Sequence, residues 1–209
     1  MTTSGSSGGS HGSRRSILAL VYSDSALADS VLREVAARMS QAGLTLAGLV
    51  QHNPVRPTRS RCDMMLEDLS TGDLVEISED RGAGARGCIL MVDQLLRAIE
   101  TVRSGLAHAP DLVILNKFGK TESEGRGLRS LIVEVVETGL LLLIAVPYRN
   151  LDNWRTFASD FSHEVVLGTR EQTVEAVVGE FTRLVPGKRQ PAAARVQRSS
   201  NSSWKELPP

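Results

Sequence analysis

Residues Pro110–Asn150 read PDLVILNKFGKTESEGRGLRSLIVEVVETGLLLLIAVPYRN, and this stretch contains the pattern that decides the fold. Leu112–Leu115 is a short apolar run that suits a buried strand. Apolar residues then recur at helical spacing, at Leu128, Leu131, Ile132, Val135 and Val136. Gly139 ends this helix, and Leu140–Val146 is a second buried strand. Strand, helix and strand in this order predict a βαβ unit with parallel strands.

Polar residues gather in the same stretch where the first strand meets the helix. They are Asn116, Lys117, Lys120, Glu122, Glu124, Arg126 and Arg129. In open α/β sheets, ligands bind outside the carboxyl ends of the strands. This loop is therefore the first candidate for a site.

The rest of the body also alternates between strand and helix patterns. Strands are predicted at 16–22, 44–51, 112–115, 140–146 and 164–167, a hairpin at 62–78, and helices at 25–41, 92–106, 128–136, 151–158 and 169–184. In the helix at 92–106 the residues expected to point inward include Val92, Leu95 and Leu96. This alternation predicts an α/β fold with a mostly parallel sheet, helices on both faces and an inserted β-hairpin.

One domain is expected, over residues 16–185, between two segments of different composition. Residues 1–15 form a Ser/Gly-rich arm and residues 186–209 a basic tail, both of which we expect to be disordered. Arg14-Arg15 before an apolar run resembles an export signal, but the run stops at Tyr22 and Asp24 follows, so we interpret it as the first core strand. The tail has one alternative role, as a docking arm.

Composition excludes several classes of function. The 24 basic and 24 acidic residues balance, so no overall field favours nucleic acid or a membrane surface. The longest apolar run is too short to cross a bilayer, and we expect a cytoplasmic protein without membrane insertion. Cys62 and Cys88 are too few for a disulfide framework and lack metal-ligand spacing, so we expect core thiols and no metal site.

The order of elements resembles the P-loop nucleoside-triphosphatase family first described from thermophiles, and it implies a three-layer P-loop-type fold. The resemblance is carried by three segments, Cys62–Leu69 at the family's hairpin, Leu112–Lys120 at its Walker B strand, and Ala145–Arg149 at its final strand. Asn116–Arg129 together with Pro147–Phe157 is more similar to an uncharacterised bacterial family that is often encoded beside molybdate transport genes. That second resemblance implies a context in molybdenum metabolism and no defined activity.

The departures from the P-loop pattern bear on catalysis. A phosphate loop requires G-x-x-x-x-G-K-[ST], whereas Tyr22–Ser30 contains no glycine or lysine and has two aspartates that would repel a triphosphate. Asn116 stands where the family has its Mg²⁺-binding aspartate, and Lys117 stands where it has the catalytic glutamate. We therefore expect no efficient hydrolysis, and the sequence identifies no catalytic residue.

The remaining polar chemistry is basic and predicts an anion site. Its candidate residues are Lys117, Lys120, Arg126, Arg129, Arg86, Arg149 and Asn116. Arg126 and Arg129 are expected to project from one face of the helix, and Arg86 belongs to a Gly-rich loop with Arg81. The alternative is that these cations form ordinary ion pairs with Glu122 and Glu124.

Three functions remain open at this point. The first is a degenerate nucleoside-triphosphatase-like protein that binds a nucleotide or a small oxyanion, with nucleotide and molybdate as candidate ligands. The second is an active NTPase or phosphotransferase with an unorthodox phosphate loop at Gly82–Gly87. The third is a non-enzymatic interaction module with a protein partner in molybdenum metabolism.

Overall fold

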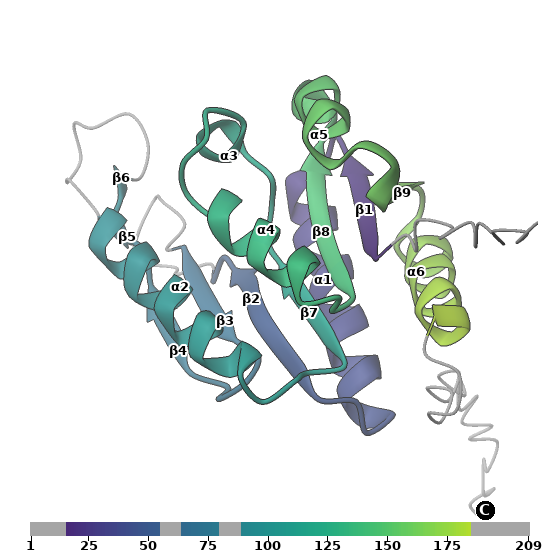
Figure 1. The fold of residues 1–209 in the computed structure, drawn as a ribbon, viewed down its shortest axis with the longest axis horizontal. Coiled ribbons are helices and arrows are strands. Elements are labelled where there is room, and N and C mark those ends of the chain that lie inside the picture. The colour runs from purple at the N-terminus through teal and green to yellow at the C-terminus, as the bar shows by residue number, and fades with distance from the viewer. Residues whose placement is uncertain (1–15, 55–63, 80–88, 185–209) are drawn as a thin grey trace, which may run out of the picture.

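The structure is a computed structural model that describes residues 16–54, 64–79 and 89–184 (Figure 1). The predictions that concern Cys62, Arg86, Cys88 and the Gly82–Gly87 loop lie outside these ranges. The strands are β1 (Ile17–Tyr22), β2 (Leu46–His52), β3 (Met65–Asp68), β4 (Leu74–Glu76), β5 (Ser78–Glu79), β6 (Ile89–Leu90), β7 (Leu112–Leu115), β8 (Leu142–Pro147) and β9 (Ser162–Val166). The helices are α1 (Ser25–Gln41), α2 (Val92–Leu106), α3 (Lys120–Ser123), α4 (Arg129–Glu137), α5 (Leu151–Ala158) and α6 (Arg170–Leu184), with short 3-10 turns at Tyr148–Asn150 and Ser159–Phe161.

Seven strands form one sheet in the order β4-β3-β2-β7-β8-β1-β9. The pairs that join β2, β7, β8, β1 and β9 are all parallel, whereas β3 and β4 add to the β2 edge as an antiparallel hairpin. The predicted α/β class, mostly parallel sheet and inserted hairpin are confirmed.

Two apolar cores cover the two faces of this sheet, because successive strand residues point to opposite sides. Ile17, Ala19 and Val21 of β1 pack with α2, α4 and α5, whereas Leu18 and Leu20 pack with α1 and α6. Figure 1 shows the same layers, with α2 and α4 on the near face and α1 behind the sheet. The connections that follow the adjacent strands β1 and β8 therefore lead to opposite faces of the sheet. The place between the carboxyl ends of these two strands is a topological switch point, and open α/β sheets bind ligands at such points.

Gly48 in β2 allows the two central strands β2 and β7 to approach closely. Its φ is +117°, and a Cβ placed there would lie 1.9 Å from the carbonyl oxygen of Ile114 on β7. Only glycine fits, because the neighbouring atom belongs to the backbone and cannot rotate away.

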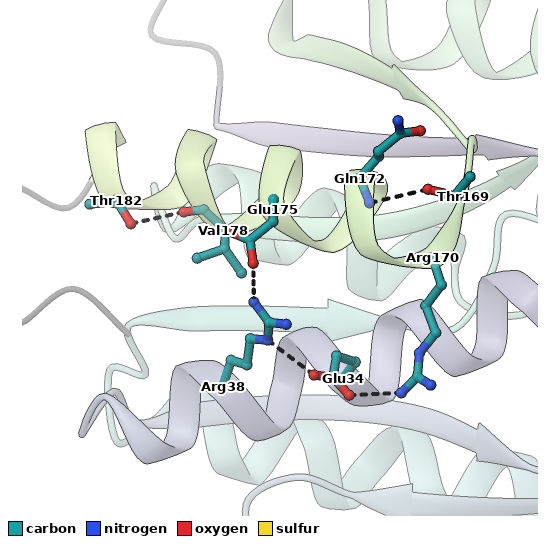
Figure 2. Close-up of polar contacts among 8 residues, drawn as sticks. All are labelled: Glu34, Arg38, Thr169, Arg170, Gln172, Glu175, Val178 and Thr182. Atoms are coloured by element: carbon teal, nitrogen blue, oxygen red, sulfur yellow. Dashed lines mark hydrogen bonds and ion pairs between the residues drawn. The ribbon is translucent and has the colours of Figure 1, made fainter. Parts of the chain in front are cut away.

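Helices α1 and α6 are joined by a charged network that Figure 2 shows. Arg38 donates from Nε to Glu34 at 3.0 Å and from a terminal nitrogen to Glu175 at 2.5 Å. Arg170 donates to the second oxygen of Glu34 at 2.7 Å. The network fixes the pairing of the two helices more than it stabilises the fold, since half-exposed ion pairs contribute little each.

Two expectations about helices are wrong. Val92 and Leu96 of α2 are 59% and 53% exposed, because the buried stripe runs from the partly buried Leu95 through Ala98, Ile99, Val102 and Leu106. Leu96 is one residue, about 100° of helix rotation, away from that stripe, and Val92 lies in the first turn.

Arg126 is not on the face of a helix with Arg129. The chain forms the short helix α3, then a turn with positive φ at Gly125 (+88°) and Gly127 (+61°), and α4 begins only at Arg129.

No helix among the described residues is long and apolar enough to cross a membrane.

We expect Gly48→Ala to lower the free energy of unfolding by at least about 2 kcal/mol, because a strained φ and an overpacked contact each cost about 1–3 kcal/mol. Gly43→Ala is the matched control, since Gly43 also has a positive φ of +82° but has no atom within 4 Å of the added Cβ. That control should lose about 1 kcal/mol. Urea unfolding measures both, and equal losses would contradict the close-approach argument.

Candidate functional site

A cavity of about 290 Å³ opens at the carboxyl edge of the sheet, next to the ends of β2, β7 and β8. Its lining contains both apolar and polar side chains. The lining residues are Leu49, Gln51, Met64, Leu66, Ile77, Leu90, Leu95, Asn116, Lys117, Gly119, Lys120, Thr121, Glu122, Leu128 and Arg149. Its volume is near the lower end of the range for small-molecule sites.

A chain of side-chain amides runs from the cavity to Asp29 on α1. Asn116 Nδ2 donates to Gln51 Oε1 at 2.7 Å, and Gln51 Nε2 donates to Asn53 Oδ1 at 2.8 Å. Asn53 Nδ2 then donates to Asp29 Oδ2 at 3.0 Å. Asn116, Gln51 and Asp29 are buried. Every donor in this relay therefore points toward the carboxylate.

Asn116 has one polar atom that the relay leaves unsatisfied. Its Oδ1 is buried and has no hydrogen-bond partner among the described residues. Buried polar atoms are nearly always paired, so this orphaned acceptor marks a place where the site is incomplete as it stands.

Burial raises the pKa of the Asp29 carboxyl above its ordinary value of 3.8, and the positive charges of Lys117, Arg33 and His52 and the bond from Asn53 oppose that rise. Burial likewise raises the pKa of Tyr22, with Asp29 adding to the rise and Arg149 opposing it. The carboxyl edge of the central strands thus combines one destabilised acid with several cations.

Glu122 holds the loop between β7 and α4 in shape. Its carboxylate accepts from the backbone N–H of Gly119 at 2.8 Å and from that of Leu128 at 3.0 Å, and its side chain is buried. Gly127 passes so close that an added Cβ would lie 2.2 Å from Glu122 Oε1. Both carboxylate oxygens are therefore occupied by the backbone of the loop, and Glu122 is a structural acceptor.

Aromatic contacts fix the same loop against α5. Phe118 packs edge-on against Trp154, with ring centroids 5.1 Å apart, and stacks on Phe157 at 5.5 Å. The backbone of Phe118 donates to Ala145 and accepts from Asn150, so the loop is also bonded to β8 and to the turn that follows it. The polar residues on either side of Phe118 are thus held on rigid elements.

The predicted anion-binding residues separate into two groups. Asn116, Lys117, Lys120 and Arg149 all line the cavity. Arg126 is 72% exposed and pairs with Glu124 at 2.6 Å, and Arg129 lies 4.2 Å above the ring of Phe157. To bind a ligand, either arginine would have to leave its present partner. A ligand role for any of these residues stays a prediction, and Arg86 lies outside the described ranges.

The first strand-to-helix connection differs from a phosphate loop in geometry as well as in sequence. Only Ser23 and Asp24 separate β1 from α1, and Asp24 Oδ1 accepts from the backbone N–H of Leu27 at 3.0 Å. The helix N-terminus already has a carboxylate on it, which occupies one of its N–H groups and disfavours an anionic ligand there.

A second cavity of about 530 Å³ lies at the opposite, amino edge of the sheet. Its lining contains hydroxyls and His108 but no charged side chain. Because ligands of open α/β sheets bind at the carboxyl edge, we assign the candidate site to the smaller cavity. No group of three or more potential metal-ligating side chains occurs in the part of the chain that the structure describes.

Asp29, Gln51 and Asn53 are site residues that sequence reasoning missed. One signal was available, since Gln51 and Asn53 are polar residues at the end of an otherwise apolar strand pattern, as Asn116 is. Carboxyl ends of neighbouring parallel strands meet at one edge, so the strand order was the missing piece of information.

Comparison with known proteins gives a family and a similar protein. A family model described as "Protein of unknown function (DUF2478)" matches residues 17–176. A protein named molybdenum import ATP-binding protein ModC 2, from Bradyrhizobium diazoefficiens, is 31% identical over 160 residues. That match covers 77% of this chain but only 18% of the relative, so the chain spans less than a fifth of that protein's length. No solved structure matches the chain.

We expect Glu122→Ala to lower the free energy of unfolding by about 3 kcal/mol, because one buried and one partly buried backbone N–H group lose a charged acceptor. Glu124 lies two residues away and is exposed, so Glu124→Ala should leave the free energy of unfolding nearly unchanged. Urea denaturation of both variants tests the assignment. A tolerated Glu122→Ala would mean that Glu122 does not hold the loop.

Proposed function

The chain belongs to the DUF2478 family, whose function is unknown, and we propose that it binds a nucleotide or a small oxyanion at the carboxyl edge of its sheet without hydrolysing it efficiently. The observation that carries this proposal is the cavity in which Lys117, Lys120 and Arg149 meet the buried amide of Asn116. Charge-assisted donors around a partly enclosed space favour an anion.

The composition of the cavity walls supports an anion with an apolar part as well as a bare oxyanion. Met64, Ile77 and Leu95 supply an apolar surface in the cavity that the basic residues also line. A nucleotide could place its base on the apolar side and its phosphate among the cations, whereas an oxyanion would occupy the basic side alone. Both ligands share the negatively charged oxygens that Lys117 and Arg149 can bind.

Two features support binding without efficient hydrolysis. Asp24 caps α1 where a phosphate loop would have free N–H groups. The residues after β7 are Asn116 and Lys117, neither of which offers a carboxylate to hold Mg²⁺ or to activate water. The alternative of an unorthodox phosphate loop at Gly82–Gly87 concerns residues outside the described ranges.

A role in molybdenum metabolism, in the cytoplasm, is part of the proposal. It is supported by the similarity to a segment of a longer protein named for molybdenum import. Molybdate is an oxyanion of the kind that the basic side of the cavity suits, and it is therefore the first oxyanion to test.

An interaction module is the second candidate function, and a separate observation favours it. Leu74, Leu90, Val92 and Leu96 are large apolar residues that are exposed on β4, β6 and α2. Exposed apolar residues that gather on neighbouring elements are typical of protein-binding surfaces. The partner would be a protein of molybdenum metabolism, and Leu96→Glu would abolish its binding while leaving anion binding intact.

We expect a nucleotide, molybdate, sulfate or phosphate to raise the melting temperature, since a ligand that binds only the folded state stabilises it. Lys117→Ala and Arg149→Ala should each weaken binding of that anion about tenfold or more, because each removes a charged donor. Arg97→Ala is the matched control, an exposed arginine on α2 that does not line the cavity. Calorimetry measures the affinities. Equal affinity in all three variants would place the site elsewhere.

We expect ATP and GTP to be hydrolysed no faster than about 10⁻³ s⁻¹, the scale of an unassisted GTPase. Phosphate release from the purified protein with Mg²⁺ measures this rate. A turnover near about 1 s⁻¹ that Lys117→Ala abolishes would show an active enzyme instead.

A further inference from the structure

The relay that ends on Asp29 links the ligand site to a titratable group on the opposite face of the sheet. Gln51 and Asn116 line the cavity on the α2 and α4 side, whereas Asp29 belongs to α1 on the other side. The connection passes over the carboxyl edge through Asn53. A change at Asp29 can therefore reach the cavity through hydrogen bonds alone.

We propose that Asp29 and the amides of Asn53, Gln51 and Asn116 form a proton-linked relay, through which the cavity takes up a proton when it binds an anion. This inference rests on the proposed function, because it describes how the same site is regulated. Asp29 is a positioning residue in it, since it acts on the ligand through the amides.

The direction of the relay depends on the charge of Asp29. With Asp29 ionised, each amide donates toward the carboxylate, as the structure shows. A protonated Asp29 has an O–H donor, which favours the opposite direction, in which each amide accepts from its neighbour on the Asp29 side. Reversal requires only that each of the three amides exchanges its oxygen and nitrogen.

Reversal also changes what Asn116 presents. In the observed direction its Oδ1 is the buried acceptor without a partner among the described residues. In the reversed direction Oδ1 accepts from Gln51, and the N–H₂ group takes the place that Oδ1 held. Oδ1 is buried, so the effect on a ligand comes from the dipole of the amide, which belongs to a residue that lines the cavity. An anion in the cavity would be repelled by the first arrangement and attracted by the second.

The electrostatics of the surroundings support the same linkage. Burial already raises the pKa of Asp29, and Lys117 is the charge that opposes this rise most strongly. The other charged or titratable groups that face Asp29 are Arg33 on α1, His52 on β2 and Tyr22 on β1. An anion that engages Lys117 weakens the support for ionised Asp29, so the pKa of Asp29 rises further and a proton is bound.

The sign of the pH dependence follows from that shift. Protonation of Asp29 and anion binding favour each other, so affinity increases as the pH falls through the range in which Asp29 titrates, by up to about tenfold per pH unit. Asp29→Asn resembles the protonated state, because asparagine can both accept from and donate to Asn53. This variant should bind tightly at every pH.

The experiment is calorimetric titration with molybdate and with sulfate, which both keep two negative charges throughout the neutral range. Heats in two buffers of different ionisation enthalpy give the number of protons bound per anion. We expect uptake of a fraction of one proton by the parent protein and none by Asp29→Asn. Asp24→Asn is the matched control, because it removes an equal charge from the start of α1 while asparagine still caps the helix. Its proton uptake should be unchanged.

Two further variants separate the relay from simpler explanations. Gln51→Met removes the middle of the relay but leaves Asp29 and Lys117 in place. Proton uptake should therefore fall to the part that Lys117 supplies through charge. Uptake equal to that of the parent protein would show coupling through charge alone and would overturn the relay. His52→Gln should keep the proton uptake, because His52 Nε2 pairs with Glu67 at 2.6 Å outside the relay. Loss of uptake in this variant would assign the proton to His52 instead.

Absence of binding at every pH overturns the proposed function and this inference with it. Binding without proton uptake in the parent protein overturns this inference alone.

Discussion

The candidate site depends on the close approach of β2 and β7, which Gly48 permits. The parallel register pairs Gly48 with Ile114 and Leu49 with Leu115, so the two strands end side by side. Gln51 is consequently within hydrogen-bond distance of Asn116, and the relay can form. A side chain at position 48 would separate the strands at the place where their polar ends must meet. One glycine within the sheet thus controls a contact at its carboxyl edge.

The loop that follows β7 is organised by a carboxylate, although its sequence is rich in cations. Glu122 binds two backbone N–H groups, and Glu124 pairs with Lys120 and Arg126. The alternative of ordinary ion pairs therefore describes Lys120 and Arg126, which pair with Glu124. The anion-site prediction concerns the cations that line the cavity without such a pair. Lys117 and Arg149 have no ion pair with a described residue and line the cavity. The balance of 24 basic and 24 acidic residues holds for the whole chain, so the net charge gave no indication of a local basic site.

The sequence predicted the strands and helices whose apolar residues recur at a regular period. It did not predict the features of the structure that depend on tertiary contacts. The strand at Leu112–Leu115 and the helix at Val92–Leu106 were predicted with their observed bounds, because their apolar patterns are continuous. The break between α3 and α4 was not foreseen, since it depends on Gly125, Gly127 and the reach of Glu122. The grouping of Lys117 with Arg149 follows from parallel strand ends, whereas Asp29 enters the site only through the strand order.

A buried acid among cations is an unusual arrangement for a site that only has to attract anions. Asp29 opposes the very charge that Lys117 would offer a ligand, and burial makes its ionised form costly for the fold. A neutral residue at this position would favour both anion binding and stability. A buried acid at this position is useful only if its charge changes during function. In that case the ionised form of Asp29 keeps the anion affinity low until a proton binds. The directed amides between Asp29 and the orphaned Asn116 oxygen supply the physical link that such a change requires.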